Sequence, residues 1–213
     1  MPLAVKLVYS AFAAVLIPIY LRDYGPTNFL YFCDVALLMT IVALWRESPL
    51  WASMPAVGIL LPQTFWILDF LAEAAGFPLT GMTHYMFDAK YPLFTRGLST
   101  FHLWLPLVLL WLVARLGYDR RALWRWTLLS WALLTVCYIA MPPPPAPADN
   151  ANLPVNINYV YGLNERTPQT RLLPTVYFLL VMLILPTCVY LPTHWTLNRL
   201  WGQRAPNAES KAV

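Results

Sequence analysis

Long runs of apolar residues, separated by short polar breaks, cover most of this sequence. A helix needs about 20 apolar residues to cross a hydrocarbon core about 30 Å thick, and charged residues, glycines and prolines mark where each run stops. The pattern predicts an all-α integral membrane protein with one domain, residues 1–213, folded as a six-transmembrane-helix bundle. The predicted crossings are residues 3–21, 27–45, 50–71, 98–116, 123–141 and 172–197.

The composition supports the same fold class. Of the 213 residues, 59% are hydrophobic and 11% are charged, whereas soluble domains carry about 25% charged residues. A soluble domain of this size could not bury so much apolar surface. The net charge of +4 is spread between the apolar runs, so it indicates membrane topology and no nucleic-acid partner.

Two connections between the predicted crossings are long, residues 73–97 and 142–171, and the basic residues assign them a side. If both termini share one side, that side holds nine of the fourteen basic residues and the other holds five. The excess predicts cytoplasmic termini and two outward-facing loops, in a bacterial-type inner membrane. The nine are Lys6, Arg46, Arg115, Arg120, Arg121, Arg125, Arg199, Arg204 and Lys211.

Asp34 lies inside the second apolar run. An ionisable group within a crossing costs about 2.5–3.5 kcal/mol on insertion scales and marks a candidate functional site. In a continuous helix Thr27, Tyr31 and Asp34 share one face. The alternative is a protonated or hydrogen-bonded Asp34 that only fixes helix packing.

His102 begins the fourth run at the depth expected for Asp34, and Gln63 occupies the same outer half of the third run. We therefore expect several polar side chains to converge in a pocket near the outer face. His102 would act there as a general base and Asp34 would orient it or stabilise its charge. A hydrogen-bonded structural histidine is the alternative. For Thr27 the alternatives are a nucleophile and a helix N-cap after the Gly-Pro turn.

The outer loops add further candidates for substrate binding. His84 and Asp88 are four residues apart and would be neighbours on a helical turn, although an interfacial polar pair has the same pattern. Asn158 follows Asn156 after the proline run and either caps the pocket or shapes a turn.

The sequence predicts neither a cofactor nor a metal. A b-type haem needs two histidines at matched depth on facing helices, and His102 has no such partner. No cluster of three close ligands occurs in the sequence, although the acids and histidines of the outer end could converge in space. The charged groups gather at one end, which favours a pocket over a transport pathway.

A few motifs resemble known membrane families. Thr27-Asn28, together with His102 and Pro106, resembles the androgen-induced-protein family of six-span proteins. The segment 156–159, Asn-Ile-Asn-Tyr, resembles bacterial six-span proteins related to membrane acyltransferases. The resemblance implies a hydrolase or acyltransferase on lipid esters, with Thr27 as the nucleophile and His102 as the base. Asp34 and the long proline-led loop depart from that pattern.

The sequence thus predicts an inner-membrane protein with an outer-leaflet polar pocket that acts on membrane lipids. The candidate catalytic residues are His102, Asp34 and Thr27, and Asn28, Tyr31, Gln63, His84, Asp88 and Asn158 are candidates for substrate binding. The alternatives are a non-enzymatic subunit or assembly factor, docked on a membrane-protein partner or a second copy of the chain, and a small-molecule transporter.

Overall fold

The structure is a computed structural model that describes residues 1–77, 79–148, 150, 153–164 and 167–202. Every named element in this part of the chain is helical. In order these are α1 (Leu3–Asp23), η1 (Pro26–Leu30), α2 (Phe32–Arg46), α3 (Pro49–Ala74), η2 (His84–Met86), α4 (Leu93–Leu98), α5 (Phe101–Leu116), α6 (Ala122–Ala140), η3 (Ile157–Tyr159), α7 (Pro174–Ile184), the π-helical turn η4 (Leu185–Tyr190) and α8 (Leu191–Trp201).

Among the described residues, five helical runs are long and apolar enough to cross a membrane, which is consistent with the predicted multi-pass helical protein. They are Leu3–Asp23, Pro49–Ala74, Leu93–Leu116, Ala122–Ala140 and Pro174–Trp201. Helix α2 has 15 residues, or about 22 Å at 1.5 Å per residue, and is too short to cross by itself. The second predicted crossing, residues 27–45, is therefore not confirmed, and neither is the six-crossing bundle.

The second apolar run is shorter as a helix than predicted because its first part folds differently. Residues Pro26–Leu30 form a 3₁₀ helix, and Tyr31 is extended, with φ −62° and ψ 137°. The prediction of one continuous helix from residue 27 was wrong. Consequently Thr27, Tyr31 and Asp34 do not share a helical face, and Asp34 lies in the first turn of α2.

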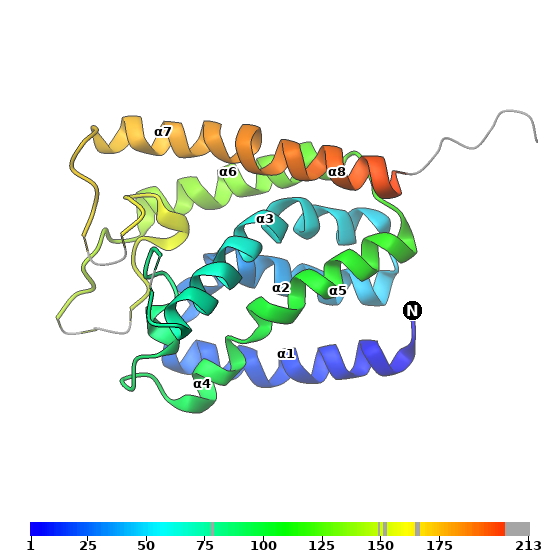
Figure 1. The fold of residues 1–213 in the computed structure, drawn as a ribbon, viewed down its shortest axis with the longest axis horizontal. Coiled ribbons are helices and arrows are strands. Elements are labelled where there is room, and N and C mark those ends of the chain that lie inside the picture. Colours follow the sequence, from blue (N-terminus) through cyan, green and yellow to red (C-terminus); the bar gives the residue numbers. More distant parts are fainter. Residues whose placement is uncertain (78, 149, 151–152, 165–166, 203–213) are drawn as a thin grey trace, which may run out of the picture.

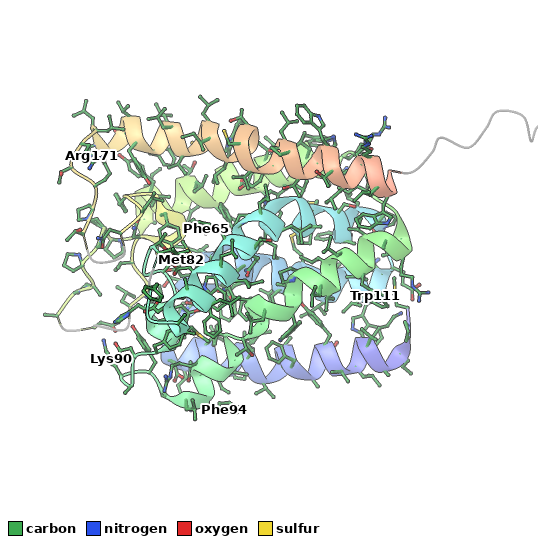
Figure 2. The ribbon with its side chains drawn as sticks, viewed as in Figure 1. Phe65, Met82, Lys90, Phe94, Trp111 and Arg171 are labelled. Atoms are coloured by element: carbon green, nitrogen blue, oxygen red, sulfur yellow. The ribbon has the colours of Figure 1, made fainter. Side chains whose placement is uncertain are left out.

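The helices lie side by side in one bundle (Figure 1). The N-terminus and the end of α8 lie at that end, whereas the two long loops lie at the opposite end. Figure 2 shows Lys90 and Arg171 at the loop-bearing end and Trp111 nearer the other. This arrangement agrees with the predicted grouping of the loops on one side.

Helix α3 lies at the centre and contacts α2, α5 and α6. Small buried residues allow its backbone to approach its neighbours closely, as is common between membrane helices. Gly58 faces the completely buried Trp126 of α6, so closely that a Cβ at this position would overlap the indole ring. Pro55 and Pro62 are both accommodated within α3.

The 142–171 loop folds back over the bundle. Its η3 segment contacts η1 and α6, and the Tyr161 hydroxyl donates to the Tyr138 and Met141 carbonyls at the end of α6, at 2.6 and 3.2 Å. The described part of this loop therefore packs on the bundle where α2 begins and α6 ends.

Candidate functional site

Asp34 is almost fully buried at the start of α2, where 3% of its surface is exposed. Asn28 of η1 donates from Nδ2 to Asp34 Oδ2 at 3.0 Å. The other carboxylate oxygen, Oδ1, is buried and has no hydrogen-bond partner among the described residues. The 3₁₀ turn thus brings two of the predicted site residues together and leaves one acid oxygen available.

His102 is buried in the first turn of α5. Its Nδ1 lies 2.8 Å from the carbonyl oxygen of Ser99. Because a carbonyl only accepts hydrogen bonds, Nδ1 carries the proton, and Nε2 is the basic nitrogen of the neutral ring. The indole of Trp66 stacks on the imidazole, with 4.5 Å between ring centroids and an interplanar angle of 23°. Both contacts fix the orientation of the ring.

Ser99 links this turn to α1. Its hydroxyl lies 2.7 Å from the Tyr20 hydroxyl and 3.4 Å from the Thr95 carbonyl. Since that carbonyl can only accept, Ser99 donates to it and Tyr20 donates to Ser99. The interruption between α4 and α5 is therefore held by buried hydrogen bonds, which position the backbone carbonyl that orients His102.

No hydrogen bond or ion pair joins Asp34 to His102 in the part of the chain that the structure describes. Asp34 is bound by Asn28, and the Nδ1 of His102 is bound by Ser99. The helices that carry them, α2 and α5, contact each other, and both contact α3. The orientation of the imidazole that was expected from Asp34 comes instead from Ser99 and Trp66.

Two further candidate residues, Thr27 and Gln63, have a buried side-chain oxygen without a hydrogen-bond partner among the described residues. These oxygens are Thr27 Oγ1 and Gln63 Oε1. Gln63 lies one turn from Trp66 on α3, which places it on the face that meets His102. The Thr27 side chain caps neither helix, since the N-cap positions of η1 and α2 are Gly25 and Tyr31. The alternative prediction of Thr27 as an N-cap was wrong.

The side chains of His84 and Asp88 bind different partners, although the Asp88 backbone N–H donates to the His84 carbonyl at 3.2 Å. Residues His84–Met86 form a short 3₁₀ helix. His84 Nδ1 lies 2.8 Å from Glu73 Oε1, and Asp88 Oδ1 accepts from the Lys90 backbone N–H at 2.9 Å. Both side chains stabilise the loop that follows α3.

Asp69 has a larger part in this loop than sequence reasoning gave it. It is completely buried and accepts from the backbone N–H groups of Thr80 and Thr83, at 2.7 and 3.1 Å. The Thr83 hydroxyl lies 2.9 Å from Asp69 Oδ2 and also 2.9 Å from Glu73 Oε2. The sequence feature that could have predicted this role is the pair Asp69 and Glu73, four residues apart at the end of a helix and followed by a loop that contains threonines.

The Asn158 side chain binds backbone. It accepts from the Phe32 N–H at 2.9 Å and donates to the Leu30 carbonyl at 2.8 Å, on the two sides of the extended residue before α2. Asn156 similarly binds the backbone of its own loop, accepting from Tyr161 N–H at 2.8 Å. Of the two alternatives for this segment, shaping the backbone accounts for these contacts.

No group of three or more His, Cys, Asp or Glu side chains among the described residues is arranged to hold a metal ion. Two surface hollows, of about 610 and 580 Å³, lie beside α4 and in the loop before α7. Neither of them is lined by Asp34, His102 or Thr27.

No family model, curated protein or solved structure matches this chain. The resemblance to six-span lipid hydrolases and acyltransferases therefore remains a prediction.

Proposed function

We propose that the protein is a membrane-embedded hydrolase or acyltransferase that acts on lipid esters, with His102 as general base. The observation that carries this proposal is the hydrogen bond from His102 Nδ1 to the Ser99 carbonyl. It assigns the proton to Nδ1, directs the basic lone pair to Nε2 and, with the Trp66 stack, holds the ring rigidly.

In the proposed reaction, Nε2 of His102 removes the proton from the nucleophile as it attacks the ester carbonyl carbon. The carbon–oxygen bond to the alcohol breaks, and the imidazolium returns the proton to the leaving alkoxide. With the Thr27 hydroxyl as nucleophile, an acyl-threonine forms and is then transferred to water or to a second alcohol. With water as nucleophile, the acid is released directly.

Asp34 acts in this scheme through its second carboxylate oxygen. Asn28 holds Oδ2, and Oδ1 remains able to receive a hydrogen bond from the substrate or stabilise the imidazolium through its charge. Tyr31 and Gln63 are the other proposed substrate contacts, whereas His84, Asp88 and Asn158 bind loop residues and backbone.

The proposed topology has six crossings, with η1 and α2 together forming the second. Both termini are cytoplasmic and the loops face outward, in agreement with the distribution of basic residues. The membrane is of the bacterial inner type. This orientation directs the Asp34–His102 region to lipids of the outer leaflet.

A non-enzymatic role is favoured by one observation. Asp34 and His102 are each hydrogen-bonded to a neighbour in their own segment and not to each other. Such internally bonded polar residues suit a subunit or assembly factor docked on a membrane-protein partner or on a second copy of the chain.

The test uses His102→Gln, because glutamine retains a donor for the Ser99 carbonyl but removes the base. We expect turnover of lipid esters by the purified protein to fall about 10²- to 10⁴-fold, with little change in melting temperature in detergent. The substrate is first found by untargeted lipid profiling of membranes with and without the protein.

The matched control is His194→Gln at the opposite end of the bundle, where the imidazole binds the Tyr118 hydroxyl at 2.7 Å. This variant is expected to keep full turnover. Thr27→Ser should retain activity and Thr27→Val should lose it if threonine is the nucleophile, whereas water as nucleophile leaves both active. An active His102→Gln variant, or a wild type without turnover on any lipid, would overturn the enzymatic proposal.

A further inference from the structure

The end of the bundle that carries the N-terminus and the end of α8 has a concentration of arginine and tryptophan on two elements. The N-cap residue Arg121 precedes Trp124 and Arg125 of α6 by three and four residues, so the three side chains share one face at the start of this helix. Helix α8 presents Trp195 and Arg199 four residues apart. Trp124 and Trp195 are 53% and 63% exposed.

Specific contacts hold these two elements together. The Tyr118 N–H donates to the Trp201 carbonyl at 2.7 Å, and the Tyr118 hydroxyl binds His194. Arg120 Nε donates to Asn198 Oδ1 at 2.8 Å. Figure 1 shows the turn between α5 and α6 beside the end of α8. The two arginine-bearing faces are therefore parts of one surface.

The charge of this surface is mostly unbalanced. Among the described residues Asp119 is paired with Arg121, with Oδ2 2.8 Å from Nη2. This guanidinium lowers the pKa of the Asp119 carboxyl, which is therefore ionised at neutral pH. No carboxylate in the described part of the chain forms an ion pair with Arg120, Arg125 or Arg199. The Nε of Arg125 is buried without a hydrogen-bond partner there, and its guanidinium lies 5.2 Å from the Trp124 ring centre.

We infer that this surface binds the headgroup of an anionic phospholipid in the leaflet on the side of the termini. Guanidinium groups bind phosphate oxygens in a planar, two-pronged geometry. Tryptophans at the ends of membrane helices sit at headgroup depth, which places these arginines beside the lipid phosphates. At headgroup depth the phosphates of the surrounding lipids are closer to this surface, and more concentrated, than any anion dissolved in water. The surface consists of Arg120, Arg121, Trp124, Arg125, Trp195 and Arg199.

The test compares lipid binding by wild type and Arg125→Gln/Arg199→Gln. These two substitutions leave the Arg120–Asn198 and Arg121–Asp119 contacts in place, so the elements stay joined. The purified full chain is titrated in detergent with phosphatidylglycerol or phosphatidylcholine, and retained lipid is counted by native mass spectrometry. A basic residue near a lipid surface contributes roughly a fivefold change in affinity. We expect phosphatidylglycerol to bind about 25-fold more weakly to the double variant.

Arg22→Gln/Arg46→Gln is the matched control, because it removes the same charge from other elements. It is expected to bind phosphatidylglycerol like wild type, and phosphatidylcholine should bind weakly to all three proteins. Equal binding of the two lipids by wild type would overturn the inference. So would an equal loss in the control, an unchanged affinity in Arg125→Gln/Arg199→Gln, or displacement of the lipid by millimolar inorganic phosphate. Melting without added lipid confirms that every variant is folded.

Discussion

Replacing Gly58 with alanine tests whether α3 and α6 pack as closely as the structure describes. The added Cβ would overlap the indole of Trp126. That ring is completely buried and contacts two other aromatic rings, Phe32 at 6.1 Å and Tyr190 at 6.5 Å between centroids. It cannot move aside without disturbing both, so we expect Gly58→Ala to be destabilising although alanine favours helix.

The magnitude follows from two opposing effects. Alanine stabilises a helix by about 1 kcal/mol relative to glycine, whereas overpacking a core costs typically 1–3 kcal/mol and occasionally more. The overlap involves a rigid ring, so the larger cost applies. A net loss of about 2 kcal/mol in the free energy of unfolding corresponds to a melting temperature about 4–8 °C lower for a chain of this size.

The measurement is thermal unfolding in detergent, followed by circular dichroism, with Gly97→Ala as the control. A Cβ at Gly97 meets no heavy atom within 4 Å, so this variant should melt at or above the wild-type temperature. A double-mutant cycle with Trp126→Leu identifies the contact, because Gly58→Ala should cost little once the indole is gone. The packing argument is refuted if Gly58→Ala melts no lower than wild type, or if its cost is the same without the indole.

Two further predictions concern the loops. Asn158→Ala should lower the free energy of unfolding by about 2–3 kcal/mol, because it leaves the Phe32 N–H and the Leu30 carbonyl without the Asn158 side chain and places alanine at φ 56°. Asn158→Gly should recover about 1 kcal/mol of this loss in the same melting assay, because glycine adopts positive φ without strain. Equal losses in the two variants would exclude backbone strain. Lys6, followed by the N-terminal amine, lowers the pKa of Glu47 from 4.5 to about 2, so its contribution to stability is present above about pH 4.5 and is lost as the pH falls towards 2. The melting temperature of Glu47→Gln should therefore vary less than that of wild type between pH 6 and pH 3, and identical pH profiles would show that this ion pair contributes nothing.

Hydrophobic run length predicted the long helices well, because lipid imposes one requirement on every crossing. The predicted 50–71 and 123–141 segments correspond to α3 (Pro49–Ala74) and α6 (Ala122–Ala140). Run length did not predict the conformation of residues 27–31. These residues continue into an apolar run, but Pro26 starts a 3₁₀ helix and Tyr31 is extended. Hydropathy indicates whether a segment prefers an apolar environment, and it does not specify the backbone angles of that segment.

The candidate site shows a different limit. Asp34 and His102 were identified because a polar group within an apolar run is costly, and Asn28 was identified beside them. The backbone partners of His102 and Asn158 were not predicted: His102 binds a backbone carbonyl, and Asn158 binds the backbone on both sides of Tyr31. Every residue has a carbonyl and nearly every residue an N–H group, so no residue type marks which of them a side chain will bind. Trp66 was missed because tryptophan in an apolar run has no distinctive signal.

The contact between Asn158 and Phe32 also determines when the region around the start of α2 can finish folding during synthesis. The two residues are 126 positions apart, so the ribosome makes most of the chain before the amide that binds the first N–H of α2 exists. Until then the start of α2 has to satisfy that group with water or translocon. Nascent chains that end before residue 158 should therefore keep this segment accessible to proteases and to water-soluble labels, and it becomes covered only when the 142–171 loop has been made.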